Sequence, residues 1–195
     1  MNNSFVNRKD RIVASAIEII SEAGLESLTT RTLAMKENMS ESLLYRYFGG
    51  IDEVLVEVVD TFTRFDNSII ATIQEKDIPH FDKVVELLNV LGTYYGGYTE
   101  MASLVLNYEG LLHNVNTRDA ITECIYRRTK FVRDELAAAI AEGEIIDLFT
   151  PEELSNILFG SCTRDLLNRR IENDRRTHAD IASVTIEKLS GLLKK

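Results

Sequence analysis

Side chains that can contact a nucleic acid gather between residues 29 and 46. Hydroxyl groups bind phosphate oxygens, and an arginine binds either a phosphate or the edge of a guanine. Two short helical patterns with a tight turn between them carry these side chains, and such a pair can place its second helix in a DNA groove. The residues with this potential are Thr29, Thr30, Arg31, Ser40, Glu41, Ser42, Tyr45 and Arg46.

The two helices of this expected helix-turn-helix have recognisable ends. Thr29 or Thr30 can cap a first helix that ends near Asn38. Asparagine tolerates the left-handed backbone that such a turn requires. Ser40 can cap the second helix, and two glycines break the pattern after Phe48. The sequence therefore predicts a helix from Ser40 to Phe48 as the element that enters the groove.

Helical patterns account for the rest of the chain as well. Apolar residues recur at spacings of three and four, and no segment alternates as a strand does. The sequence therefore predicts an all-α protein with about nine helices. The other helices are expected at residues 8–23, from 51 into the low 70s, and at 81–91, 99–113, 117–141, 151–173 and 178–193.

Composition indicates a globular protein. The chain has 195 residues, of which 45% are hydrophobic and 27% charged, and this suits one or two domains with a real core. No apolar run approaches the roughly 18 residues that a membrane span needs. The polar start lacks the apolar centre of a signal peptide, so we expect a cytoplasmic protein with free thiols at Cys124 and Cys162.

The acidic charge of the chain lies outside the expected helix-turn-helix. Residues 1–51 hold six basic and six acidic side chains and are neutral, whereas the remainder holds 16 basic and 25 acidic ones and carries the whole net charge of −9. A DNA-binding surface normally has an excess of positive charge. The charge distribution thus permits DNA binding but does not strengthen it.

Together these features resemble the TetR family of transcriptional regulators. The resemblance is close over residues 8–60, and it rests on Gly24 at the end of the first helix, the threonine pair, and the run LYRYFG at residues 44–49 before the acidic first turn of a long helix. Beyond residue 60 only the helical outline matches. The resemblance implies a DNA-binding head of residues 1–50 and a body of residues 51–195 that binds a small ligand and dimerises.

Four positions depart from the family pattern in the expected head. The family usually has a basic residue in place of Glu41, a phosphate-binding lysine in place of Ile51, a glycine in place of Asn38, and a small or hydroxyl residue in place of Leu43. Each lost phosphate contact weakens binding and lowers its salt dependence. A carboxylate can instead accept a hydrogen bond from a cytosine amino group. We therefore expect weak or unusual DNA binding.

Aromatic side chains are frequent in the middle of the expected body. A pocket between helices needs an apolar wall with a few polar groups, and tyrosines supply both, although aromatic residues also simply fill cores. The glycine-containing segment 92–98 is expected to break the helical pattern and to move with a ligand. The candidate ligand-binding residues are Phe62, Phe65, Tyr94, Tyr95, Tyr98, Met101, Tyr108 and Tyr126.

The last two expected helices carry apolar stripes. Two such helices from each of two subunits could form a four-helix bundle, which is the usual interface of the family. The alternative is that the stripes pack only on their own body. The candidate interface residues are Leu154, Ile157, Leu158, Ser161, Ile181, Val184 and Leu189.

Three classes of function are possible for such a chain. The sequence favours a ligand-responsive regulator, a repressor that binds a palindromic operator as a dimer and is released by a partly apolar small molecule. The alternative is a co-regulator of similar fold that has lost specific DNA binding and acts through protein partners. An enzyme is not expected, because no nucleophile–base pair, phosphate-binding loop, cofactor motif or metal site is recognisable, and His80, His113 and His178 are not grouped.

Overall fold

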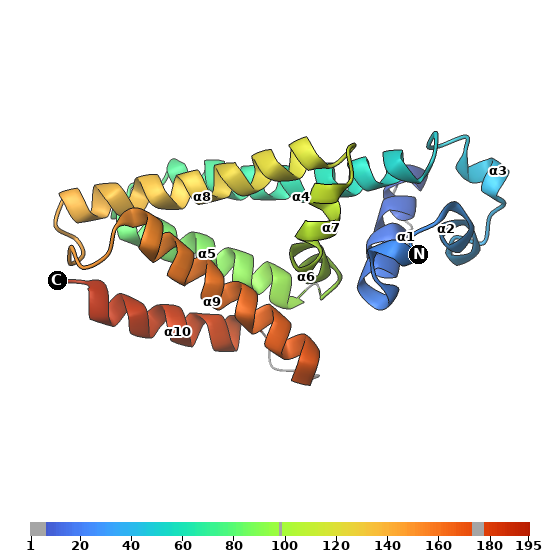
Figure 1. The fold of residues 1–195 in the computed structure, drawn as a ribbon. Helices are drawn as coiled ribbons and strands as arrows, with labels where there is room; N and C mark the ends of the chain where they lie inside the picture. The colour runs from blue at the N-terminus through green and yellow to red at the C-terminus, as the bar shows by residue number, and fades with distance from the viewer. Residues whose placement is uncertain (1–6, 98, 173–177) are drawn as a thin grey trace, which may run out of the picture. The chain divides into compact units, whose positions relative to one another are not determined.

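The computed structural model describes the backbone of residues 7–97, 99–172 and 178–195. It describes the side chains of the same residues except those within 96–99 and 172–183. These residues form ten α-helices and one short 3-10 helix, and none of them forms a strand, so the predicted all-α class is confirmed (Figure 1). The elements are α1 (Arg8–Ala23), η1 (Leu25–Ser27), α2 (Thr30–Lys36), α3 (Glu41–Leu44), α4 (Ile51–Gln74), α5 (His80–Gly97), α6 (Thr99–Leu106), α7 (Tyr108–His113), α8 (Arg118–Ala141), α9 (Pro151–Glu172) and α10 (His178–Leu193).

The described residues separate into two compact units. The first comprises those up to Arg64 together with Thr99–Thr122, and the second comprises those of Phe65–Tyr98 and Glu123–Lys195. Residues 99–122 join the first unit because α6 packs on α1. The functional division into residues 1–50 and 51–195 remains a prediction.

Several helix boundaries follow the local signals in the sequence. Thr150 caps α9, since its Oγ1 accepts from the Glu153 backbone N–H at 3.2 Å while the Glu153 carboxylate accepts from the Thr150 N–H at 2.9 Å. Gly143 has φ of 74° and ends the turn after α8. Both cysteines are free, as predicted, and burial raises the pKa of the Cys162 thiol to about 11.

Three of the predicted helices differ from the structure. The helix expected at 99–113 is divided into α6 and α7, because Asn107 leaves helical geometry with φ of −108° and ψ of 15°. The prediction of a break at residues 92–98 was wrong for residues 92–97, because these residues continue helix α5. Leu91 and Tyr95 are buried at helical spacing, so packing holds this helical turn despite the glycines that follow it.

The helix expected from Ser40 to Phe48 is also shorter than predicted. Regular helix ends at Leu44. After it, the Arg46 N–H donates to the Leu43 carbonyl at 3.2 Å and the Tyr47 N–H to the Leu44 carbonyl at 2.9 Å, which are three-residue hydrogen bonds. The helix therefore tightens into 3-10-type turns over its last residues, as helix ends often do.

His80, at the start of α5, is surrounded by carboxylates of the second unit. Its Nδ1 lies 2.6 Å from Glu135 and its Nε2 lies 3.4 Å from Glu142, while the Glu144 carboxylate accepts from the backbone N–H groups of His80 at 3.0 Å and Phe81 at 2.8 Å. The hydrogen bond with Glu135 is the main cause that raises the pKa of His80 above its usual 6.5. Protonated His80 therefore ties α5 to α8.

We expect this cluster to make stability depend on pH. Because the pKa of His80 is higher in the folded than in the unfolded chain, its contribution is complete below about pH 6.5 and is lost as the pH rises through the folded pKa. At pH 6 the free energy of unfolding of the wild type should exceed that of His80→Gln by about 1 kcal/mol, which corresponds to roughly 2–4 °C in Tm. At pH 8 the difference should be smaller. Thermal denaturation at both pH values measures this. His113→Gln, at a side chain that is 76% exposed, should show no comparable trend.

Candidate DNA-binding surface and effector site

The helix-turn-helix is built from local hydrogen bonds. Thr29 Oγ1 accepts from the Thr32 N–H at 3.1 Å, and Thr32 Oγ1 accepts from the Thr29 N–H at 2.9 Å, so these two residues cap α2 reciprocally. Ser40 Oγ accepts from the Leu43 N–H at 3.2 Å and caps α3. Asn38, between the helices, has φ of 49°, which is the left-handed turn that the sequence predicts.

The outer surface of this head carries the predicted DNA-contacting side chains. Below them, Leu33, Leu44 and Phe48 are at most 4% exposed and form the core of the head. Tyr45 is 54% exposed, whereas Tyr47 is half-buried. Thr30 is half-buried, and the other candidates on the surface are Thr29, Arg31, Ser40, Glu41, Ser42 and Arg46. The turn thus presents hydroxyls, one phenol and two guanidinium groups to solvent.

Most cations of the head are paired within it. Glu37 is buried and accepts hydrogen bonds from Ser15 Oγ at 2.8 Å and from the Arg11 guanidinium at 3.3 Å, with Arg8 Nε at 4.0 Å. The arginines at the start of α1 therefore neutralise a buried carboxylate, which limits what they can offer to a phosphate.

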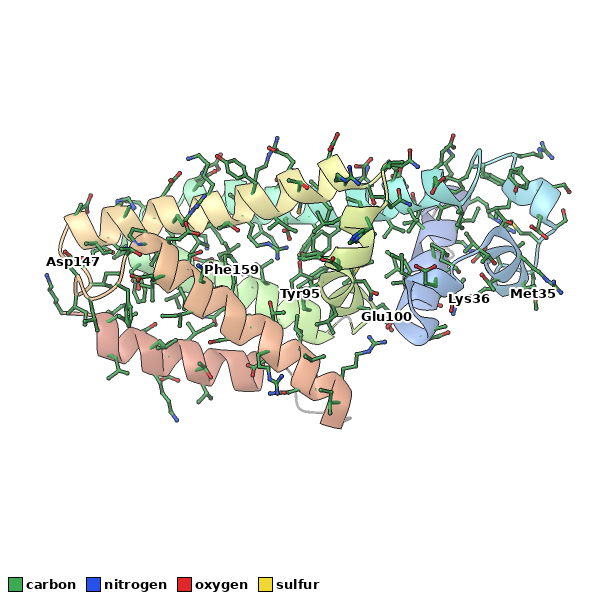
Figure 2. All side chains as sticks on the ribbon, viewed as in Figure 1. Met35, Lys36, Tyr95, Glu100, Asp147 and Phe159 are labelled. Atoms are coloured by element: carbon green, nitrogen blue, oxygen red, sulfur yellow. The ribbon has the colours of Figure 1, made fainter. Side chains whose placement is uncertain are left out.

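The two lysines of the head are also engaged. Lys36 lies at the end of α2 beside α1 (Figure 2), where its Nζ lies 2.9 Å from Glu18 and 3.3 Å from Glu22. Lys9 Nζ lies 5.1 Å from the centre of the Phe48 ring. Among the described residues up to Ile51, only Arg31 and Arg46 then remain as cations without a carboxylate or ring partner.

Glu41, the acidic departure from the family pattern, contacts the start of α2. Thr30 Oγ1 donates to Glu41 Oε2 at 2.7 Å, across the turn between the two helices. The sequence did not reveal this contact, because the residues are 11 apart and belong to different helices. Ile51, the other departure, begins α4 and is half-buried. The hydroxyl of Thr30 is thus already committed as a donor.

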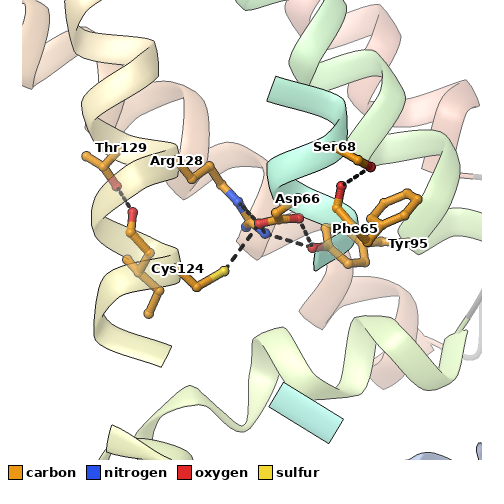
Figure 3. Close-up of polar contacts among 8 residues, drawn as sticks. Phe65, Asp66, Ser68, Tyr95, Cys124, Arg128 and Thr129 are labelled. Atoms are coloured by element: carbon orange, nitrogen blue, oxygen red, sulfur yellow. Dashed lines mark hydrogen bonds and ion pairs between the residues drawn. The ribbon is translucent and has the colours of Figure 1, made fainter. Parts of the chain in front are cut away.

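A buried ion pair lies inside the second unit. Arg128 on α8 donates to Asp66 on α4, with Nε 2.8 Å from Oδ2, and also donates to the Tyr95 hydroxyl on α5 at 2.8 Å (Figure 3). The Cys124 thiol donates to the same oxygen, Oδ2 of Asp66, at 3.5 Å. Asp66 is 2% and Arg128 8% exposed. This polar centre joins three helices.

This pair was not predicted from the sequence. Asp66 falls four residues after Phe62 and seven before Ile73, both of which are almost fully buried. A carboxylate on the apolar stripe of α4 was therefore the feature of the sequence that could have indicated a buried ion pair. Its partner Arg128 could not be recognised, because arginine is common on exposed helix faces and the pairing joins residues that are 62 apart.

The predicted ligand-binding residues fall into several groups. Phe65 stacks on Tyr94, with ring centres 3.5 Å apart, and Tyr94 contacts Tyr95 edge-on at 5.4 Å (Figure 2 labels Tyr95). Of these three rings, Tyr95 contacts the ion pair through its hydroxyl. Phe62, Met101 and Tyr108 belong to the first unit, where Phe62 and Tyr108 meet edge-on at 6.0 Å. Tyr126 is 52% exposed and stacks on none of the other described rings, and Tyr98 lies outside the described residues.

Described residues of the second unit line two open grooves. The larger, of about 720 Å³, follows α5 and is mostly apolar; Tyr94 is its one lining residue among the predicted ligand contacts. The smaller, of about 370 Å³, lies between α4 and α8. The larger groove is lined by Ile78, Asp82, Val85, Glu86, Asn89, Val90, Thr93 and Tyr94.

The predicted dimer residues divide into buried and exposed ones. Leu154 and Leu158 are each 2% exposed, so their own chain already covers them. Ser161 and Leu189 are half-buried, and the side chain of Ile181 lies outside those described. Among the described side chains of α9 and α10, the large apolar ones at the surface are Ile157, Leu167, Ile171, Val184 and Leu192, with exposures from 37% to 73%.

Metal sites and membrane spans are not found in the described part of the chain. The described histidine, cysteine, aspartate and glutamate side chains form no group of three or more that could hold a metal ion. Among the helices that the structure describes, none is both long and apolar enough to cross a membrane.

Comparison with known proteins identifies the head. Residues 12–58 match the model of bacterial regulatory proteins of the tetR family. This range covers the helix-turn-helix and the first turns of α4. No curated protein is similar enough in sequence to count as a match.

Solved structures match almost the whole chain. The ketosteroid transcriptional regulator KstR2 of Mycobacterium tuberculosis matches with a TM-score of 0.83 at 15% identity, over 98% of this chain and 97% of its own. The TetR family regulator PfmR from Thermus thermophilus matches with 0.79 at 15% identity, over 95% and 100%. FadR from Bacillus subtilis, solved with stearoyl-CoA, matches with 0.74 at 18% identity, over 92% and 96%.

The two comparisons are consistent with each other. The family model matches the head, and the structural matches extend the same fold to the rest of the chain. Residues 12–58 therefore carry the head of the bacterial regulatory proteins of the tetR family, and the chain as a whole has the fold of the solved TetR family regulators.

Proposed function

We propose that the chain is a ligand-responsive repressor that binds a palindromic operator as a homodimer in the cytoplasm. The observation that carries this proposal is the complete helix-turn-helix, with caps at Thr29 and Ser40 and a left-handed turn at Asn38. Two such heads in a dimer read half-sites roughly 34–36 Å apart. Palindromic DNA follows from the twofold symmetry of a homodimer.

The exposed side chains of the head have distinct tasks in this proposal. Arg31 and Arg46, which have no carboxylate partner among the described residues, supply the charge for phosphates or a guanine edge. Tyr45 and Ser42 donate hydroxyl hydrogen bonds to phosphates. Because the head has few available cations, we expect binding to depend weakly on salt for a protein of this class.

The effector is proposed to be a small, partly apolar molecule bound by the second unit. Phe65, Tyr94 and Tyr95 supply aromatic surface next to the buried pair of Asp66 and Arg128. Apolar walls with a few placed polar groups are typical of ligand sites. Stearoyl-CoA, present in the FadR structure, is a suitable first probe.

Release would follow from a shift between two arrangements of the dimer. Helix α4 runs from the head to Asp66, so a ligand that changes the surroundings of the ion pair acts on a helix continuous with the head. The effector needs only to bind better to the arrangement whose heads do not fit adjacent grooves.

The dimer is proposed to form through the exposed apolar side chains of α9 and α10. Ile157→Asp or Val184→Asp should convert a dimer to a monomer, because each places a charge in the interface. Analytical ultracentrifugation measures the change. Leu148→Asp is the matched control, since Leu148 is 66% exposed but lies between α8 and α9. If both Ile157→Asp and Val184→Asp leave the dimer intact, the dimer does not form through this surface.

Selection of bound sequences from random double-stranded DNA tests the function. The full chain should enrich a palindrome, and Arg46→Ala should lose the enrichment. Arg64→Ala, which removes an exposed arginine paired with Glu57 outside the head turn, should retain it. Addition of effector should release the selected DNA. A stable dimer that enriches no sequence would contradict the repressor.

A co-regulator that acts through protein partners is the second candidate. The internal pairing of Arg8, Arg11 and Lys36, together with the carboxylate of Glu41 on the outer surface, favours it. The same selection separates the two functions, because this candidate predicts a dimer without sequence enrichment.

A further inference from the structure

We infer that Glu41 selects cytosine at one position of each half-site and that Thr30 positions it. This role rests on the proposed function and names a base that the head prefers. It concerns an acidic side chain that lies among the exposed DNA-facing candidates and whose contact with α2 is resolved in the structure.

The geometry restricts the orientation of the carboxylate. Thr30 Oγ1 donates to Oε2 of Glu41 at 2.7 Å, which couples the first residue of α3 to the first residue of α2. A flexible glutamate on a surface would lose conformational entropy on contacting a base. The hydrogen bond from Thr30 reduces this cost and leaves Oε1 as the acceptor that can face the groove.

The chemistry of the base edges favours cytosine. An ionised carboxylate only accepts hydrogen bonds. In the major groove, cytosine offers the N4 amino donor, whereas guanine offers two acceptors and thymine one acceptor and a methyl group. Adenine offers a donor beside the N7 acceptor, which repels the second carboxylate oxygen. Cytosine is therefore the base that meets Glu41 without an opposed acceptor.

The carboxylate of Glu41 disfavours binding to DNA sites that do not place a cytosine next to it. Glu41 repels phosphates, and the two described cations nearest in the sequence form no ion pair with it: Lys36 is paired with Glu18 and Glu22 on α1, and Arg46 has no described carboxylate partner. Any DNA register that places a phosphate or an acceptor base at Glu41 is penalised. Glu41 thus raises specificity while it lowers general affinity.

Binding to single-base variants of the selected operator tests this inference. The wild type should prefer cytosine at one half-site position over the other bases by roughly 5- to 100-fold. Glu41→Gln should lose this preference and favour adenine, whose N6 and N7 groups suit an amide. Thr30→Val should reduce the cytosine preference severalfold, and Thr30→Ser should restore it.

The control separates base reading from simple repulsion. Glu26→Gln removes the same charge from an exposed glutamate of the head outside the two helices, and should leave the preference unchanged. If Glu41→Gln tightens binding to all sequences equally and enriches an unchanged operator, Glu41 is only a repelling charge and the inference is wrong. If the wild type enriches no sequence at all, the proposed function fails first, and the inference with it.

Discussion

Asp66→Ala is expected to destabilise the protein by about 3–5 kcal/mol, because it leaves the Arg128 guanidinium buried without its counter-charge. For a chain of this size the loss corresponds to roughly 6–20 °C in Tm. The mechanism is desolvation: a buried charge that is neither solvated nor paired is far less favourable than either alternative. Chemical denaturation of the full chain measures the difference.

Two comparisons make this expectation specific to the buried pair. Asp134→Ala breaks the exposed pair of Lys130 and Asp134, whose side chains are 52% and 62% exposed, and should leave the free energy of unfolding almost unchanged. Replacing Asp66 and Arg128 together by Leu and Met should cost less than Asp66→Ala alone, since no unpaired charge remains. If Asp66→Ala lowers the free energy of unfolding only slightly, the ion pair of Asp66 and Arg128 is not buried away from water.

The second large effect is expected at the DNA surface. The double variant Glu41→Lys/Ile51→Lys should steepen the dependence of log K on log salt by nearly two units, about 0.9 for each added phosphate contact. If the plots of log K against log salt for the wild type and the variant meet near 1 M salt, each added contact strengthens non-specific binding roughly tenfold at 50 mM salt. Fluorescence anisotropy with a duplex of random sequence, over a range of salt concentrations, measures both quantities.

A variant with the same change in charge is available as the control. Glu26→Lys/Val115→Lys adds equal charge at exposed positions outside the helix-turn-helix and the start of α4. It should steepen the salt dependence less. Equal slopes for the two double variants would mean that only total charge matters, and that Glu41 and Ile51 do not lie at the phosphates.

The sequence predicted those parts of the fold that depend on local interactions. The cap at Thr150, the turn at Asn38 and the end of α8 at Gly143 each depend on a few adjacent residues, and each was found. The extension of α5 through residues 92–97 was not predicted, because glycine lowers helix propensity locally while the burial of Tyr95 acts through distant helices.

The candidate sites were less predictable for the same reason. Exposure of Tyr45 and Arg46 follows from helix geometry, so the outer surface of the head could be named in advance. The contact of Thr30 with Glu41 and the pair of Asp66 with Arg128 join separate helices and need the fold itself. Helical periodicity shows which side of a helix is buried, but not which residue of another helix meets it.

Titration of the selected palindrome with the full chain tests the central claim most directly. We expect two chains per duplex and a preference of at least about a thousandfold over a scrambled duplex at physiological salt, with a shallow dependence on salt. Equal affinity for the scrambled duplex, or nanomolar non-specific binding with a steep salt dependence, would contradict a sequence-specific regulator whose head has few available cations.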